Sequence, residues 1–307
     1  MTGSMDQPRR FLVLPHTGRD ASKRAAAEVI GALLAAGTVP VLAEEDVAAL
    51  VEADPIAGRA EVLGRDCVLG DIELAIVLGG DGTILHAAET VRGGALPLIG
   101  VNLGHVGFLA EAEREDLEEV VRRALAGDYV VEERMTIDVR VMTRDGAEVF
   151  ATWALNEATV EKSSPGKMVE VVIEIDGRPL SAFGCDGLLM ATPTGSTAYA
   201  FSAGGPVVWP DVEAMLLVPL SAHALFARPL VLAPSAVLAV EISESTPAPG
   251  VLWCDGRRSV ALEPGMRIEV VRGRAPVRLA RLIRGKFTDR LVQKFDLPVS
   301  GWRGSAR

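Results

Sequence analysis

Residues 74–83 read LAIVLGGDGT, an apolar run that stops at three glycines with one carboxylate among them. A continuous apolar run of this length is typical of a strand that is covered on both faces of a parallel sheet. Glycines between a strand and a helix let the backbone approach an anion closely. Because a carboxylate repels phosphate, Asp81 in such a loop indicates a chemical role or a metal ion.

The segments around this run alternate between strand and helix patterns. Strands are predicted at residues 11–14, 39–42, 74–78 and 96–101, and helices at residues 21–36, 84–92 and 115–126. Gly37 suits the position just after the first of these helices. Alternation of this kind predicts an open parallel sheet with helices on both faces.

The pattern changes after residues 127–128. Asp145-Gly146 and Asp176-Gly177 are hairpin signals between β-branched runs, and further strands are predicted at residues 231–232, 236–242, 251–254 and 267–271. We therefore predict an α/β plus all-β protein: an N-terminal open parallel α/β sheet domain over residues 1–128 and a C-terminal β-sandwich domain over residues 129–279.

The composition narrows the class of protein. The 307 residues are 49% hydrophobic with a net charge of −10, so a full core is available and a global basic field for nucleic acid is excluded. Three widely separated cysteines show no metal-binding spacing. Since no apolar run approaches the roughly 20 residues of a membrane span, we expect a soluble cytoplasmic protein without a membrane or nucleic-acid partner.

The glycine loop matches neither of the common phosphate-binding patterns, G-x-x-x-x-G-K-[ST] and G-x-G-x-x-G. Phosphates are therefore expected to bind through N–H groups of Gly79, Gly80, Gly82 and Thr83 and through the start of the following helix. Asp81 can then accept a proton from a substrate hydroxyl or hold Mg²⁺. An ordinary turn with an aspartate cap is the alternative.

Two later stretches are rich in hydrogen-bonding groups. Asn156-Glu157 follows the apolar Trp153-Ala154-Leu155, and residues 184–199 read GCDGLLMATPTGSTAY. Amide, carboxylate and hydroxyl groups beside an aromatic face suit a nucleoside better than a bare phosphate. Taken alone, the Asn156-Glu157 pair is better explained by an ordinary polar loop, and an ordinary Ser/Thr-rich turn explains the second stretch equally well.

The three motifs together resemble NAD kinases. The resemblance rests on GGDGT, the pair NE and GCDGLLMATPTGSTAYAFSAGGP in this order, and it continues in VPLSAHALFARPLVL and CDGR. It extends from Phe11 to the C-terminal LPVSGWRG and is similar in detail to actinobacterial members. The third motif is specific to the family, whereas GGDGT also occurs in lipid kinases.

The resemblance implies transfer of a phosphoryl group to the 2′-hydroxyl of the adenosine ribose of NAD, which gives NADP. It implies that Asp81 is the general base and that the loop glycines and Thr83 hold the donor phosphates. The residues it assigns to NAD binding are Asp81, Gly82, His86, Asn156, Glu157, Lys167, Asp186, Thr197, Ala198, Tyr199, Ser202 and Arg257.

Three of these positions depart from the family pattern. His86 and Lys167 stand where relatives carry arginine, and Arg257 replaces a common glutamine. A point charge does not reproduce a bidentate guanidinium, so the roles of these three residues stay open.

The resemblance also implies ligands and an assembly. We expect Mg²⁺ or another divalent metal bound with the donor phosphates, since the chain has no metal motif, and either ATP or polyphosphate as donor. We expect a homodimer or homotetramer formed by the β domain, in which Asp186 serves a neighbouring subunit. The family's tail packs on the first domain, which fits residues 280–307 with their amphipathic stretch 287–295.

Two alternatives remain at this point. A lipid kinase of the diacylglycerol or sphingosine type shares the glycine loop, but usually carries a Gly-Thr-Gly-Asn-Asp-like segment where residues 100–105 read GVNLGH. A non-catalytic NAD-binding sensor would be expected to lack the loop carboxylate, which Asp81 supplies.

Overall fold

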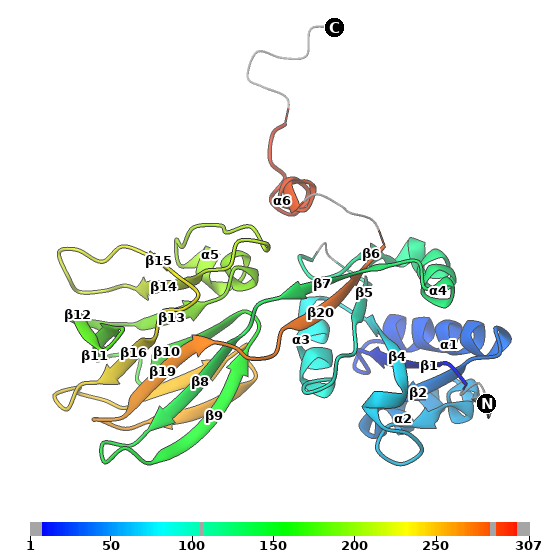
Figure 1. Ribbon diagram of the computed structural model, residues 1–307, viewed down its shortest axis with the longest axis horizontal. Coiled ribbons are helices and arrows are strands. Elements are labelled where there is room, and N and C mark those ends of the chain that lie inside the picture. The colour runs from blue at the N-terminus through cyan, green and yellow to red at the C-terminus, as the bar shows by residue number, and fades with distance from the viewer. Residues whose placement is uncertain (1–7, 105–106, 283–286, 300–307) are drawn as a thin grey trace, which may run out of the picture. The chain divides into compact units, whose positions relative to one another are not determined.

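The computed structural model describes residues 8–104, 107–282 and 287–299 and divides into two compact units (Figure 1). Unit 1 comprises Met1–Glu133 and Arg278–Arg307, and unit 2 comprises Arg134–Val277. Parts of the predicted tail, residues 283–286 and 300–307, lie outside the described residues. Within the described ranges, every helix is too short or too polar to cross a membrane.

Unit 1 is built on one eight-stranded sheet with the order β3-β2-β1-β4-β5-β20-β7, and β6 pairs with β5. The strands are β1 (Arg10–Pro15), β2 (Val39–Leu42), β3 (Glu61–Val62), β4 (Ile72–Leu78), β5 (Leu98–Asn102), β6 (Ala112–Glu113), β7 (Val130–Arg134) and β20 (Val277–Arg281). Strands β1 to β5 pair in parallel, so the predicted parallel sheet is confirmed. The strand order reverses between β1 and β4, and ligands of open α/β sheets bind at such a point.

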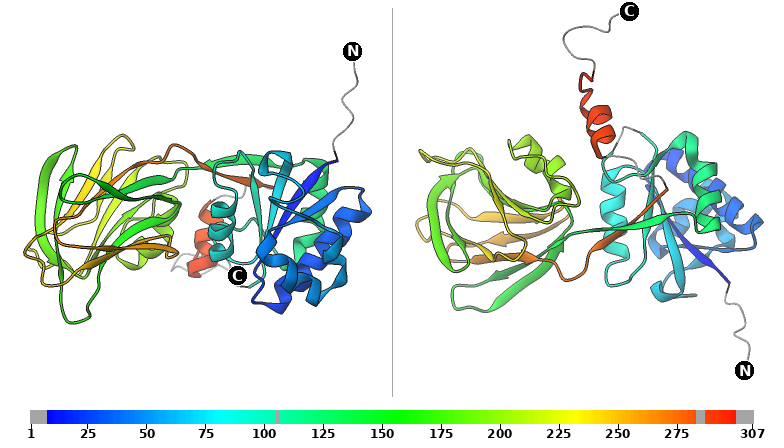
Figure 2. Two further views of the ribbon diagram at one scale, coloured as in Figure 1. Left: turned by 90° about the horizontal axis from the view of Figure 1, so that it is seen from below. Right: turned by 45° about the horizontal axis from the view of Figure 1, so that its top comes forward.

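Helices cover both faces of this sheet. They are α1 (Asp20–Ala35), α2 (Glu44–Ala53), α3 (Asp81–Thr90) and α4 (Leu117–Ala126); a further helix, α6 (Phe287–Phe295), follows late in the chain. The β1-α1-β2 and β4-α3-β5 crossovers run in opposite directions across the sheet, so right-handed connections place α1 and α3 on opposite faces (Figure 2). Helix α1 packs against α2 and α4.

Two details of unit 1 differ from the sequence prediction. Helix α3 begins at Asp81 rather than at residue 84, with Gly80 as its N-cap. The stretch 129–142, predicted as one β region, divides into two strands of different sheets: β7 joins unit 1, whereas β8 (Ile137–Met142) starts unit 2. Asp81 therefore belongs to the first turn of a helix.

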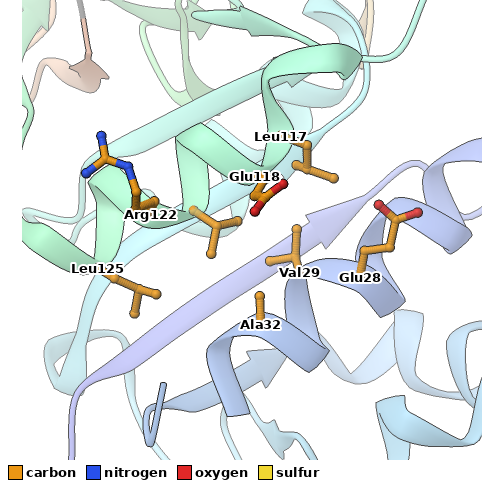
Figure 3. Close-up of a pocket in the computed structure, with 8 residues that line it drawn as sticks. Glu28, Val29, Ala32, Leu117, Glu118, Arg122 and Leu125 are labelled. Atoms are coloured by element: carbon orange, nitrogen blue, oxygen red, sulfur yellow. The ribbon is translucent and has the colours of Figure 1, made fainter. Parts of the chain in front are cut away.

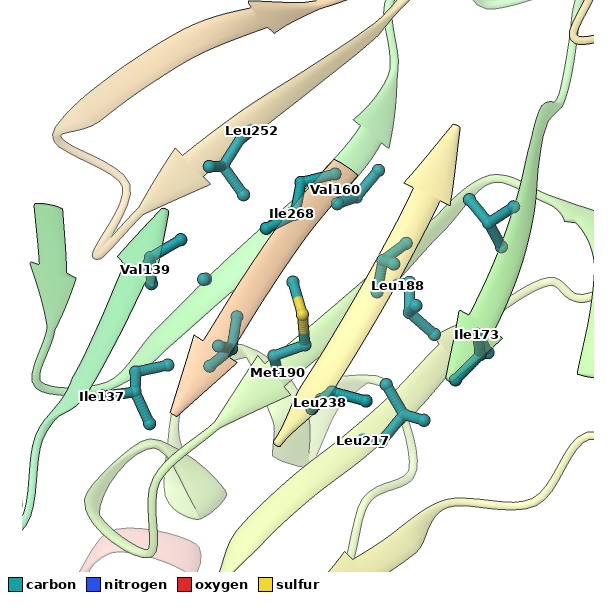
Figure 4. Packing of buried hydrophobic residues seen from close by; sticks show 14 of the residues in the cluster. Ile137, Val139, Val160, Ile173, Leu188, Met190, Leu217, Leu238, Leu252 and Ile268 are labelled. Carbon is teal, nitrogen blue, oxygen red and sulfur yellow. The ribbon is translucent and has the colours of Figure 1, made fainter. Parts of the chain in front are cut away.

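Unit 2 consists of two six-stranded sheets, with the orders β15-β14-β13-β10-β17-β18 and β12-β11-β16-β19-β8-β9. The strands besides β8 are β9 (Glu148–Ala154), β10 (Glu157–Lys162), β11 (Val169–Ile175), β12 (Arg178–Cys185), β13 (Gly187–Ala191), β14 (Met215–Leu220), β15 (Leu230–Leu232), β16 (Leu238–Ile242), β17 (Gly250–Cys254), β18 (Arg258–Leu262) and β19 (Arg267–Arg272). Buried residues of both sheets, among them Val139, Val160, Leu188 and Ile268, form one hydrophobic cluster (Figure 4). The predicted β-sandwich is confirmed.

Tight turns set the register of the hairpins. Asp176 and Gly177 have φ of 52° and 71° between β11 and β12, as a type I′ turn requires. A second turn of this kind joins β17 and β18, where Asp255 and Gly256 have φ of 52° and 63°. The sequence prediction includes the first hairpin and omits the second.

Candidate active site

The glycine loop of unit 1 lies between β4 and α3, at the reversal of strand order. A Cβ atom on Gly79 would lie 2.3 Å from Oγ1 of Thr83, so packing alone requires this glycine. A Cβ atom on Gly80 or Gly82 would meet nothing within 4 Å. Packing against the described residues therefore does not require glycine at these two positions. Without side chains there, the start of α3 is open to an anion, as binding at a helix N-terminus requires.

Asp81 is the first residue of α3, and its carboxylate is held by backbone groups. Its two oxygens accept hydrogen bonds from the N–H groups of Phe108 and Leu109, each at 3.0 Å. A Cβ atom on Gly107 would lie 2.3 Å from Oδ1 of Asp81. Asp81 as a whole residue is partly exposed, and the two backbone N–H groups fix its carboxylate in position.

His86 lies one turn further along α3 among acidic side chains. Its Nδ1 is 3.9 Å from Oε2 of Glu89. The pKa of Asp46 is raised to about 6, mainly by burial and also by Glu45, while the nearby His86 lowers it. The structure thus places His86 beside carboxylates of unit 1, and its predicted contact with NAD stays a prediction.

In unit 2, a buried aspartate fixes the backbone of the Asn156-Glu157 pair. The Asp255 carboxylate accepts hydrogen bonds from the N–H groups of Leu155 at 2.9 Å, Asn156 at 2.7 Å and Glu157 at 3.3 Å. It also forms an ion pair with Arg258 at 2.9 Å. The sequence prediction quotes Asp255 within CDGR and gives it no role, although an Asp-Gly pair between two apolar runs signals a hairpin turn.

Glu157 is buried, and its side chain is a weak acid. The pKa of Glu157 is raised to about 8, mainly by burial and also by the neighbouring Asp255 charge, against a hydrogen bond from the Tyr199 N–H that lowers it. Oε2 of Glu157 is buried without a hydrogen-bond partner among the described residues. The raised pKa favours the protonated carboxyl group, which can donate a hydrogen bond.

The hydroxyl-rich motif packs directly on Asn156. It forms the 3₁₀ turn Thr194–Thr197 and the short helix α5 (Tyr199–Ser202). The Thr192 N–H donates to the Asn156 carbonyl at 2.9 Å, and a Cβ atom on Gly195 would lie 2.0 Å from that carbonyl oxygen. The structure thus brings Asn156, Glu157 and the predicted residues Thr197, Ala198, Tyr199 and Ser202 into one region of unit 2.

The remaining predicted residues of unit 2 lie in other surroundings. Asp186, between β12 and β13, forms an ion pair with Lys162 of β10 at 2.5 Å. Lys167 is exposed and donates to the Pro247 carbonyl at 3.2 Å. Arg257 is exposed in the β17–β18 turn, beside Asp255. Asp186 directly precedes β13, which pairs with β10 and places Ala191 opposite Glu157. The Asp186 carbonyl accepts the N–H of Lys162 at the other end of this strand pair.

A groove on unit 1 lies apart from these motifs. Figure 3 shows it between α1 and α4, lined largely by apolar side chains that include Val29, Ala32, Leu117 and Leu125. None of the residues predicted for the active site lines this groove, so we do not include the groove in the candidate active site.

Comparison with known proteins decides the family. The model of the ATP-NAD kinase N-terminal domain matches residues 16–129, and that of the ATP-NAD kinase C-terminal domain matches residues 155–282. The chain belongs to the NAD kinase family. Among curated relatives, an NAD kinase of Leifsonia xyli is 60% identical over 300 residues, which cover 98% of each chain. An NAD kinase 2 of Streptomyces coelicolor is 58% identical over 98% of this chain and 99% of its own.

Solved structures show the same fold. A yeast NADH kinase complexed with NADH matches with a TM-score of 0.84 at 24% identity, covering 97% of this chain and 90% of its own. An NAD kinase from Archaeoglobus fulgidus in complex with ATP matches with a TM-score of 0.68 at 24% identity, covering 94% and 99%. The predicted fold class and NAD kinase activity are confirmed, and the lipid-kinase and sensor alternatives are set aside.

Proposed function

We propose that this NAD kinase phosphorylates the 2′-hydroxyl of the adenosine ribose of NAD, with Asp81 as the general base. The observation that carries the proposal is the Asp81 carboxylate, fixed by two backbone N–H groups at the bare start of α3. A general base works only from a fixed position within hydrogen-bond reach of the proton it accepts. Phosphoryl transfer depends mainly on such positioning and on the neutralisation of charge.

The donor phosphates would bind at the glycine loop of unit 1. Gly80 and Gly82 leave room for an anion against the N–H groups at the start of α3, while Gly79 and Thr83 pack together beneath them. Backbone N–H groups bind phosphates without distinguishing a base, so both ATP and polyphosphate are proposed as donors. The relative from Archaeoglobus fulgidus, solved with ATP, supports ATP.

A divalent metal ion, Mg²⁺ in particular, is proposed to arrive with the donor. The described residues form no group of three or more histidine, cysteine, aspartate or glutamate side chains that could hold a metal on their own. This fits Mg²⁺, which proteins bind through one or two carboxylates together with substrate phosphates. Asp81 is the carboxylate at the loop, and a bound ion would offset the charge of the donor phosphates.

Unit 2 would hold NAD. Asn156 and the protonated Glu157 present hydrogen-bonding groups whose backbone Asp255 has already fixed. The adjoining turn adds Thr197, Ala198 and Ser202, and the exposed Tyr199 ring offers a face for stacking. The roles of Asp186, His86, Lys167 and Arg257 in binding NAD are proposed on the family resemblance.

The assembly and location of the protein are proposed on the same basis. Unit 2 carries a loop between β14 and β15 with two large exposed apolar residues, Leu225 at 110% and Phe226 at 75% exposure. Exposed apolar side chains of this kind support self-association, and we propose a cytoplasmic homodimer or homotetramer. Light scattering of the wild type and Phe226→Glu tests this, since the variant should dissociate.

The activity is tested by assaying NADP formation by the purified chain. NAD and NADH are each combined with ATP and with polyphosphate, and phosphorus NMR of the product identifies the phosphorylated hydroxyl. We expect 2′-phosphorylated product with at least one donor, and none with diacylglycerol or sphingosine as acceptor. A phosphate on any other hydroxyl of NAD would contradict the proposal.

A further inference from the structure

Two consecutive residues of unit 1, Phe108 and Leu109, connect Asp81 to the C-terminal helix α6. Their N–H groups donate to the two oxygens of Asp81. Their carbonyl groups accept hydrogen bonds from arginines near the end of the chain: Phe108 from Nη1 of Arg290 at 2.9 Å, and Leu109 from Nη1 of Arg281 at 3.1 Å. Asp81 and Arg290 therefore bind opposite sides of the same short segment.

One peptide group carries both contacts. The carbonyl of Phe108 accepts from Arg290, and the N–H of Leu109, in the same planar peptide unit, donates to Oδ1 of Asp81. Any movement of that carbonyl therefore moves the N–H group that holds the carboxylate. A cation at the oxygen also polarises the peptide and strengthens the hydrogen bond on its other side.

Arg290 is itself fixed by a buried ion cluster. Its guanidinium lies 2.9 Å from Oε2 of Glu111, whose side chain is only 4% exposed. Glu111 also pairs with Arg281 at 3.1 Å and accepts the N–H of Leu282 at 2.9 Å. Burial and the nearby Arg281 charge lower the pKa of Arg290, and Glu111 opposes this. The cluster thus holds Arg290 in one geometry, since a buried charge without its partner is costly.

The side chain of Phe108 is held by the same helix, which is red in Figure 2. Its ring centroid lies 6.0 Å from that of Phe287 and 5.8 Å from that of Phe295, both tilted aromatic contacts. Phe108 is 8% exposed. Helix α6 therefore contacts Phe108 through its apolar face and, by way of Arg290, through the Phe108 backbone.

We propose that α6 positions the general base, with Arg290 as a positioning residue that acts on Asp81 through the Phe108–Leu109 peptide. The proposal rests on the proposed role of Asp81. Reacting groups must be aligned closely, and a displacement of about 1 Å can cost on the order of 10²-fold in rate. Rate should therefore depend on contacts at the far end of the chain that touch no substrate.

The test is the steady-state kinetics of Arg290→Gln in the full chain. Glutamine cannot span the Phe108 carbonyl and Glu111 as the guanidinium fork does, so we expect kcat to fall about 10- to 100-fold. KM for NAD and for ATP should change less than about threefold, because the binding groups are untouched. Arg290→Lys should recover part of the rate, since its single ammonium reaches one of the two acceptors.

Two further variants of α6 serve as a control and as a second test. Gln293→Ala changes an exposed residue of the same helix and should leave kcat and KM at wild-type values. Phe295→Ala removes one ring contact of Phe108, keeps the ion cluster and should lower kcat several-fold, so it replaces Arg290→Gln if that variant does not fold. Thermal unfolding of each variant identifies the folded ones.

The failure of this inference can be told apart from the failure of the proposed function. Asp81→Asn is measured in parallel: if it keeps wild-type kcat, Asp81 is not the base. If Asp81→Asn is inactive while folded Arg290→Gln or Phe295→Ala keeps wild-type kcat, α6 does not position Asp81. A rise in KM without a fall in kcat overturns the proposal as well.

Discussion

Asp81 in unit 1 and Asp255 in unit 2 are both hydrogen-bonded to backbone N–H groups, but the two contacts serve different purposes. Each carboxylate accepts hydrogen bonds from consecutive backbone N–H groups far along the chain. Asp255 is 7% exposed, takes three N–H groups and pairs with Arg258, so its carboxylate serves to fix the backbone. Asp81 is partly exposed at the start of a helix, so there the backbone serves to fix the carboxylate.

The largest effect on rate is expected for Asp81→Asn. The amide keeps the shape and can accept one of the two N–H bonds, but it cannot act as a base. We expect kcat for NADP formation to fall about 10²- to 10⁴-fold. The melting temperature should change little, and NAD binding by calorimetry should persist. Wild-type kcat in this variant would remove Asp81 from the mechanism.

Asp255→Ala is expected to affect stability instead. It removes the acceptor of three backbone N–H groups and the ion-pair partner of Arg258, which keeps its hydrogen bond to Thr152, and this should cost about 3–5 kcal/mol of unfolding free energy. Denaturant unfolding measures this. Asp145→Ala, at an exposed hairpin turn, is the control and should cost about 1 kcal/mol or less. Equal losses in the two variants would contradict the role given to Asp255.

Gly82→Ala separates binding from stability within the glycine loop. The backbone and the open space accept a methyl group, and alanine favours helix over glycine by up to about 1 kcal/mol. We therefore expect an unchanged or higher melting temperature together with a KM for ATP raised about tenfold, because a side chain obstructs the approach of phosphate. An unchanged KM would show that phosphate does not bind against Gly82.

The smallest effect is expected for Glu157→Gln and depends on pH. The pKa of Glu157 is raised from 4.5 to about 8, so the folded protein keeps a proton that the unfolded chain has lost. The stability linked to that proton is complete below pH 4.5 and is lost as the pH rises through 8. Glutamine does not ionise, so the variant should lose less melting temperature than the wild type between pH 6 and 9.

The sequence predicts those parts of the molecule that depend on local pattern. The run 74–78 is a strand because apolar residues without alternation suit a sheet covered on both faces. The predicted start of α3 is three residues too late because Asp81 and Gly82, two of its first residues, are poor helix formers in the interior of a helix. The division of residues 129–142 between two sheets could not be predicted, since the sequence pattern of a strand does not indicate which strand it pairs with.

The roles given to the candidate site residues stay predictions, but the structure shows which contacts around them the sequence does not indicate. The motifs indicated Asp81, Asn156 and Glu157, but neither Asp255 nor Arg290, which bind backbone groups about 100 and 182 positions away. Backbone N–H and carbonyl groups are present in every residue, so no residue type in the sequence marks which of them will be used. Only the folded chain shows those pairings.

The order of the two units along the chain has a consequence for biosynthesis. Unit 1 is interrupted by unit 2 and is completed by β20 and α6. The ribosome therefore releases all of residues 134–277 before the strand that pairs with β5 and the helix that contacts Phe108 exist. A nascent chain that ends before Arg290 carries the glycine loop and the whole of unit 2 but lacks the contacts of α6 with Phe108. If α6 positions Asp81 as proposed, such a chain should have a lower kcat than the full chain.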